Sequence, residues 1–183
     1  MLMKRLVLSA AAVLLVAGCS SSGGNGADAL LEEHGLAGLG TLEAVEQLDR
    51  TNEDRATGLS ASVTYDSVLL EDGGDTAVLP MPADQFYLSV APWATTTHDC
   101  FHHSLTGCQG ELVNTPVQVL ITDVTGAVLV DEAVSTYDNG FVGFWLPKDI
   151  DGTLEITGAQ GTATGTFSTF ADSPTCVTTL QLI

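Results

Sequence analysis

The side chains of this chain that could bind a metal or carry out redox chemistry are gathered in one short stretch. Three of its four histidines and two of its four cysteines lie between His98 and Cys108. Thiolate and imidazole groups are the ligands that bind soft Cu(I) and borderline Zn(II). Because the chain is otherwise nearly free of both residue types, this stretch indicates a metal site.

The N-terminus predicts an exported, lipid-anchored protein. Two basic residues precede an apolar run over residues 6–17, which is too short to span a bilayer and is typical of a secretory signal. The run closes in Val-Ala-Gly-Cys at Cys19, which resembles a bacterial lipobox rather than an ordinary secretory signal with an incidental cysteine. The motif implies removal of residues 1–18 and acylation of Cys19, with palmitate among the acyl chains. The mature protein would then be anchored to the cell membrane, facing outside the cytoplasm. Residues 19–27 are rich in Ser, Gly and Asn and would form a flexible tether.

An odd number of cysteines remains once Cys19 is lipidated, namely Cys100, Cys108 and Cys176. Exported proteins normally pair their cysteines, so at least one of these three stays outside any intrachain disulfide. A thiol outside the cytoplasm is exposed to oxidation. We therefore interpret the odd count as a sign of metal or redox chemistry.

The charge of the chain excludes one class of partner. The full chain of 183 residues has five basic and 23 acidic side chains, and the mature chain would keep three of the basic ones, for a net charge of −20. Nucleic-acid binding needs clustered Lys and Arg, so no nucleic-acid partner is expected. Cations would be enriched around such a protein.

The hydrophobic pattern predicts a mostly β protein, an antiparallel β-sandwich with a small N-terminal helical segment. We expect helices within residues 28–57, with Thr41 as the N-cap of the second, because apolar residues there recur at helical spacing. From residue 58 to 183 the period changes to two and turn signals recur. Residues 117–122 and 127–132, for example, flank a turn that ends at Gly126 and predict a hairpin. Short strands at such spacing are typical of a sandwich, whose last strand would run from Cys176 to Leu182.

The same pattern suggests how the metal-binding residues meet. If residues 97–103 are extended, His98 and Cys100 point one way and His103 the other, since alternate residues of a strand share a face. A turn after His103 would bring Cys108 back beside Cys100. Cys176 would have to lie next to this bend, which would place three sulfurs and one or two imidazoles within reach of one ion.

Three interpretations of this cluster remain open at this point. Thiolates with a nearby histidine suit Cu(I), which accepts two or three ligands, and a Cys3His shell also suits structural Zn(II). The third interpretation is a plain disulfide between Cys100 and Cys108, worth about 2.5 kcal/mol by loop closure. In that case the protein would be a disulfide-stapled surface module that binds a protein partner.

Four segments of the chain resemble the CueP family of bacterial exported copper-binding proteins. The resemblance covers most of residues 59–183 and includes the three cysteines at the family's separations. The matching segments are His98 to Leu112, Phe86 to Pro92, Asp138 to Pro147 and Pro174 to Leu182.

This resemblance implies a copper-binding role in copper tolerance and in copper delivery to an exported enzyme. It implies cysteine-dependent reduction of Cu(II) to Cu(I), which would need an outside thiol reductant, and no other enzyme activity is indicated. Cys100, Cys108 and Cys176 would be the metal and redox residues, with His98 and His103 as further ligands. Our own expectation for the mechanism is that the two thiols that reduce Cu(II) close as a disulfide between Cys100 and Cys108. The family's N-terminal helical region is associated with dimerisation, so a homodimer is one expectation, although the match there is loose.

Overall fold

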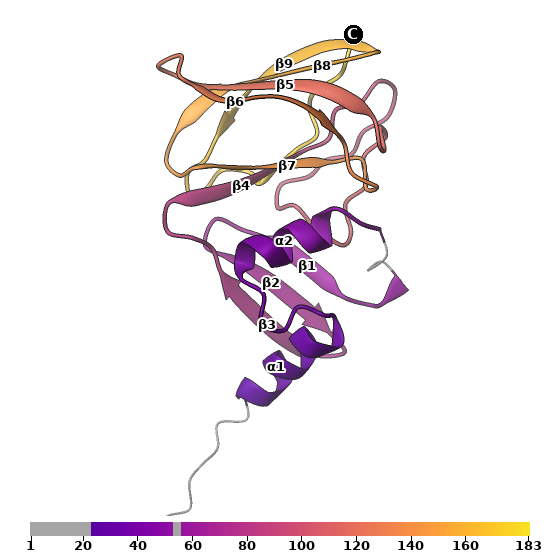
Figure 1. The fold of residues 1–183 in the computed structure, drawn as a ribbon, viewed down its shortest axis with the longest axis vertical. Helices are drawn as coiled ribbons and strands as arrows, with labels where there is room; N and C mark the ends of the chain where they lie inside the picture. The colour runs from indigo at the N-terminus through magenta and orange to yellow at the C-terminus, as the bar shows by residue number, and fades with distance from the viewer. Residues whose placement is uncertain (1–22, 53–55) are drawn as a thin grey trace, which may run out of the picture.

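The computed structural model describes residues 23–52 and 56–183 of the chain (Figure 1). It confirms the expected fold class: most strands pair antiparallel, and two short helices precede them. The predicted signal peptide, Cys19 and the start of the predicted tether lie outside the described residues. The elements are α1 Gly23–Glu33, α2 Thr41–Asp49, β1 Ser60–Val63, β2 Ser67–Asp72, β3 Asp75–Pro80, β4 Gln85–Val90, β5 Pro116–Asp123, β6 Val128–Ser135, β7 Val142–Pro147, β8 Asp151–Gly158, β9 Gly161–Ser168 and β10 Cys176–Val177.

The sandwich consists of a three-stranded sheet, β10-β4-β7, facing a four-stranded sheet, β6-β5-β8-β9. In β5 every second residue is buried, and Val119 and Ile121 lie opposite Ile156 and Leu154 of β8. These side chains pack against Leu88 and the other inward residues of β4 and β7 in one apolar core. The alternate apolar residues that predicted the strands are thus the residues that fill the core between the two sheets.

A second core lies in the N-terminal unit, where β1, β2 and β3 form a sheet of their own. The apolar stripe of α2, with Val45 and Leu48, packs in the same core as Val68 and Leu70 of β2. The period-two pattern predicted these strands as part of the sandwich. The structure places them with the helices, because their inward residues cover the apolar face of α2 that would otherwise meet water.

Two details at the helix ends differ from expectation. The tether was expected to continue to residue 27, but α1 begins at Gly23, and Ala27 and Leu30 pack in the N-terminal core. Thr41 was expected to be the N-cap of α2, but the N-cap is Gly40, and no side chain caps it. The Thr41 hydroxyl instead donates to the carbonyl of Pro80 at 2.8 Å, so it fastens the helix to β3 rather than capping it.

The end of the chain runs beside β4. Only Cys176–Val177 form regular strand pairing, parallel to Ser89–Val90, although the sequence predicted a strand as far as Leu182. Beyond it, the amide of Trp93 donates to the Leu180 carbonyl at 3.0 Å, so the chain stays beside the segment that follows β4. This pairing places Cys176 at the junction between the sandwich and the N-terminal unit.

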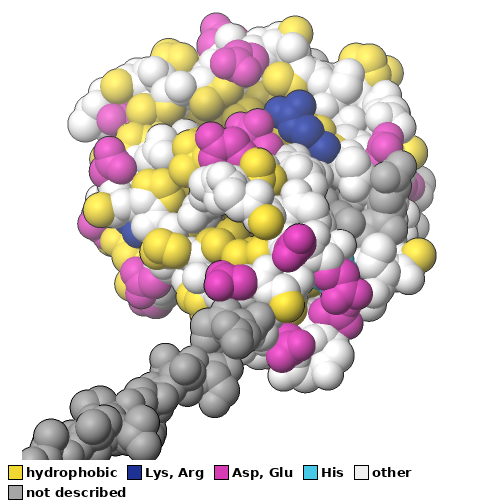
Figure 2. All heavy atoms as spheres, turned by 60° about the horizontal axis from the view of Figure 1, so that its bottom comes forward, with side chains coloured by type: hydrophobic (Ala, Val, Ile, Leu, Met, Phe, Trp, Pro, Cys, Tyr) yellow, Lys and Arg dark blue, Asp and Glu magenta, His cyan; other side chains and the backbone are white. Residues whose placement is uncertain are grey.

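Acidic side chains are spread over the face at the α1 end of the molecule, and basic ones are few there (Figure 2). None of the helices in the described part of the chain is long and apolar enough to cross a bilayer.

Candidate metal centre

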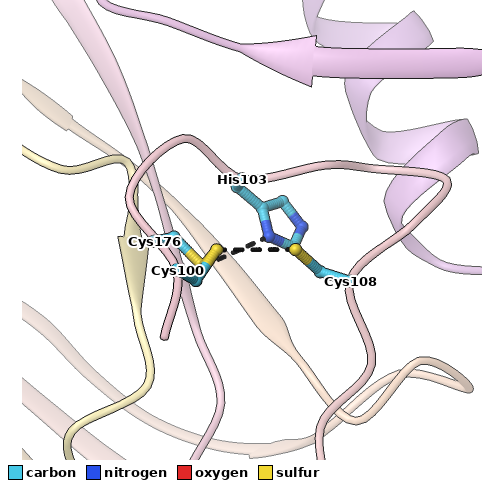
Figure 3. A group of neighbouring side chains, drawn as sticks. All are labelled: Cys100, His103, Cys108 and Cys176. Carbon is cyan, nitrogen blue, oxygen red and sulfur yellow. Dashed lines mark hydrogen bonds between the residues drawn. A yellow bond between two sulfur atoms is a disulfide. The ribbon is translucent and has the colours of Figure 1, made fainter. Parts of the chain in front are cut away.

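Cys100 and Cys176 form a disulfide, with their Cα atoms 5.6 Å apart (Figure 3). Cys176 is fixed by the pairing of β10 with β4 and is only 3% exposed, whereas Cys100 lies half-buried in the loop that follows β4. The amide of Thr175 donates to the Phe101 carbonyl at 2.9 Å and holds the two segments side by side.

Cys108 returns to the disulfide through a tight turn. Its amide donates to the Ser104 carbonyl at 3.0 Å, and its sulfur accepts from the Ser104 amide at 3.4 Å. The Cys108 Sγ then lies 3.4 Å from the Cys100 Sγ. We expected the disulfide to join Cys100 and Cys108. In the structure Cys100 is bonded to Cys176 instead, because the parallel pairing of β10 with β4 brings the Cys176 sulfur within bonding distance.

His103 completes the group and is fully buried. Its Nδ1 lies 3.7 Å from the Cys176 Sγ, and the four donor atoms of Cys100, His103, Cys108 and Cys176 all lie within 4.8 Å of one another. The three sulfurs thus meet as predicted. The predicted alternation is wrong, however, because the chain bends at residues 101–102 instead of continuing as a strand, and this bend turns His103 toward the sulfurs.

The backbone around His103 holds the ring in place. Its amide donates to the Thr175 hydroxyl at 2.9 Å, and its carbonyl accepts from the Val63 amide at 2.9 Å. The ring itself packs on Phe141, with centroids 4.6 Å apart. The imidazole is therefore fixed by β1, by the segment leading into β10 and by the residue just before β7.

Asp49 is the site residue that sequence analysis missed. This last residue of α2 is fully buried, and its Oδ1 lies 2.6 Å from Nε2 of His103. Its Oδ2 accepts from the Tyr87 hydroxyl at 2.6 Å and the Ser89 hydroxyl at 3.2 Å, and Asn139 donates to its Oδ1 at 2.8 Å. A carboxylate with this many donors is stable without water. By holding Nε2, it leaves Nδ1 facing the sulfurs.

One sequence signal could have found Asp49. It lies four residues after Val45 and directly after Leu48, on the buried face of α2. An acidic residue on the apolar face of an amphipathic helix requires a buried partner, because an isolated buried charge is costly.

The charges of the group act on one another. Burial alone would lower the pKa of His103, but the charge and hydrogen bond of Asp49 outweigh burial, and with the contact to Cys108 they raise this pKa to about 9. Burial raises the pKa of the Cys108 thiol, but hydrogen bonding and charge from His103 outweigh burial and lower it. These two pKa shifts favour the imidazolium form of His103 beside the thiolate form of Cys108. The thiolate is the form of cysteine that binds metals and attacks disulfides.

Two other histidines of the cluster do not join the group. His98 is exposed, and its ring meets the edge of Phe141 with centroids 6.2 Å apart. Phe141 therefore separates His98 from His103. His102 is also exposed, with its ring against Phe101 at a centroid distance of 4.9 Å.

The donor set fits a soft metal ion. With the disulfide open, three sulfurs and one imidazole nitrogen converge on one point, and this combination suits Cu(I) and also the tetrahedral Cys3His shell of zinc. With the disulfide closed, only the Cys108 sulfur and His103 Nδ1 remain as thiol and imidazole donors of the group. The redox state of the cysteines therefore determines whether the centre can hold a metal.

Fold and site together define a β-sandwich protein with a convergent Cys3His group that could hold a metal ion. The model of one protein family, described as periplasmic copper-binding protein CueP, matches residues 43–181. The chain therefore belongs to the CueP family, which is extracytoplasmic and copper-binding.

A solved structure supports this assignment. The structure titled "Crystal Structure of S.CueP" is similar to this chain, with a TM-score of 0.82 and 44% sequence identity. The alignment covers 91% of this chain and 100% of that one. A comparison with curated proteins finds no match.

Proposed function

We propose that this protein binds Cu(I) outside the cytoplasm through Cys100, Cys108 and Cys176 in their thiolate forms. The observation that carries the proposal is the convergence of these sulfurs and His103 Nδ1 within 4.8 Å. His103 is the fourth donor, oriented by the Asp49 carboxylate on its other nitrogen, an arrangement common for metal-binding histidines. Family membership favours copper over the zinc that the same donors would accept.

We further propose that the centre reduces Cu(II). The thiols of Cys100 and Cys176 each give one electron to one Cu(II) ion. Two Cu(I) ions form, two protons are released, and the two sulfurs close as the disulfide present in the structure. His103 lies beside the Cys176 sulfur and is hydrogen-bonded to Asp49, and this pair offers the released protons a path away from the sulfurs. An outside thiol reductant must then reopen the disulfide before the next cycle.

His98 has a separate role in this proposal. It is exposed, and with Gln109 and Glu111 it lines a shallow surface cavity beside the centre. Imidazole and carboxylate are good ligands for Cu(II), so His98 would bind the incoming ion before it reaches the sulfurs.

The function would be copper tolerance and delivery of Cu(I) to an exported enzyme, from a chain anchored to the membrane through Cys19. A second copy of the chain is a further partner to test.

An anaerobic titration with Cu(I) against a coloured Cu(I) chelator tests the binding proposal. The reduced protein should take up the ion in a defined stoichiometry, and Cys108→Ser should weaken the uptake by at least tenfold. His103→Ala and His102→Ala form a matched pair, because the two residues are neighbours and only His103 faces the sulfurs. Uptake that is unaffected in Cys108→Ser and equal in the two histidine variants would refute the proposal, and tighter competition by Zn(II) would favour the zinc alternative.

A further inference from the structure

The three sulfurs of the centre are arranged so that Cys100 can bond to either neighbour. It is bonded to Cys176, and the Cys108 sulfur faces the disulfide beneath the His103 ring (Figure 3). The Cys108 Sγ lies 3.4 Å from the Cys100 Sγ, and a disulfide bond is about 2.05 Å long. The two sulfurs therefore need to approach by only about 1.4 Å, which side-chain rotation and a small shift of the turn can supply.

The two ends of the disulfide differ in how an outside molecule can reach them. Cys176 is 3% exposed and is held by the ladder between β10 and β4. Cys100 and Cys108 are half-buried and lie on loops. An outside reductant must form a mixed disulfide with a sulfur it can reach, and the buried Cys176 sulfur does not meet that condition.

We propose that Cys108 is a relay thiol that passes reducing equivalents from an outside dithiol to the buried disulfide. The Cys108 thiolate attacks the Cys100 sulfur, a Cys100–Cys108 bond forms, and the Cys100–Cys176 bond breaks. Cys176 leaves as a thiolate. The proton that Cys108 lost passes through His103 to the Cys176 sulfur, which lies 3.7 Å from His103 Nδ1. This step consumes no electrons.

The outside dithiol then reduces the new disulfide. It attacks the Cys100–Cys108 bond, whose two sulfurs are both half-buried, and after a second exchange it leaves as its own disulfide. The protein then carries three thiols, and the reductant has lost two electrons. Cys176 is thus reduced without any contact with the reductant.

The anchoring of the loop supports the relay. Phe101 and His103 are hydrogen-bonded to Thr175, so the segment beside Cys100 stays next to β10 during the exchange. The Cys108 side is a turn held by bonds to Ser104, and its neighbours Gly107 and Gln109 are exposed. The attacking sulfur lies on the segment with more room to move, and the leaving sulfur on the fixed one.

The relay deepens the proposed function, since it supplies the reduced Cys176 on which copper binding rests. Its test uses no metal, so a failure of the relay is distinguishable from a failure of copper binding. In the test, the oxidised, metal-free protein is mixed with dithiothreitol, and samples are quenched in acid, unfolded and alkylated. Peptide mapping then follows which cysteines become thiols.

We expect Cys108→Ser to slow the opening of the Cys100–Cys176 disulfide by at least fivefold. Ser104→Ala is the matched control, because it alters the same turn but keeps the Cys108 sulfur, and it should react at the wild-type rate. A second variant, Cys176→Ser, should form the Cys100–Cys108 disulfide when treated with diamide. A smaller slowing in Cys108→Ser, an equal slowing in Ser104→Ala, or a Cys176→Ser variant that keeps both thiols would overturn the relay.

Discussion

Opening the disulfide should strongly destabilise the fold, because it closes a long loop. Cys100 and Cys176 are 76 residues apart in the chain. In the chain-entropy model a closed loop of that length contributes about 4.5 kcal/mol to the free energy of unfolding at 25 °C, whereas the eight-residue separation of Cys100 and Cys108 contributes about 2.5 kcal/mol. The two pairings therefore differ by about 2 kcal/mol, which denaturant unfolding resolves.

The assay compares urea unfolding of oxidised and phosphine-reduced protein, followed by tryptophan fluorescence. Wild type should lose about 4.5 kcal/mol on reduction, and Cys108→Ser should lose the same amount because it keeps the long-loop disulfide. Cys176→Ser, which can pair only Cys100 with Cys108, should lose about 2.5 kcal/mol. If wild type loses no more than Cys176→Ser, or if Cys108→Ser no longer responds to the reductant, the pairing across the long loop and the reasoning from it are wrong.

Three further predictions concern the buried polar group and one turn. Because the raised pKa of His103, about 9, exceeds its ordinary value of 6.5, its stabilisation is complete below pH 6.5 and is lost as the pH rises through 9. Urea unfolding should show a fall of about 3 kcal/mol between pH 6.5 and 9.5, and this fall should be absent in Asp49→Asn. Tyr87→Phe removes a hydrogen-bond donor to that carboxylate and should cost about 1.5–3 kcal/mol by the same measurement; no loss would mean that the bond is not made. Gly140→Ala should lower the Tm more than Gly126→Ala, since both have positive φ but only at Gly140 would a Cβ meet backbone, at 2.6 Å; equal Tm values would contradict this packing.

Local sequence patterns were sufficient to predict most of the strands. The alternation in Val117, Val119 and Ile121 predicted β5, and the glycine at 126 predicted the turn into β6, because both signals act between residues close in the chain. The assignment of β1–β3 to a separate sheet could not be predicted in this way. It depends on which surface covers α2, and the alternating pattern is the same in either arrangement.

The sequence was sufficient to predict that the three sulfurs of the candidate site meet. It was not sufficient to predict the buried polar residues that hold His103. The odd cysteine count and the position of Cys176 at a strand start indicated that three sulfurs meet, and they do. The choice of disulfide partner depends on differences of about 1 Å in the distances between sulfur atoms. The spacing of the cysteines along the sequence does not determine distances so finely. Asp49 lies 54 residues before His103 and reaches it only because α2 docks against β4, so no local pattern pairs the two.

The Asp49 carboxylate belongs to the N-terminal unit, whereas the four donor atoms belong to the loops and last strand of the sandwich, so the donors and the group that orients the imidazole lie in different halves of the molecule. A fragment that begins after α2 would keep Cys100, Cys108 and Cys176 and would still leave the imidazole without its anchor. If a metal ion binds here, its binding and the cohesion of the two halves are thermodynamically linked. The bound ion should then hold the halves more tightly together, and a motion that separates them should weaken its binding.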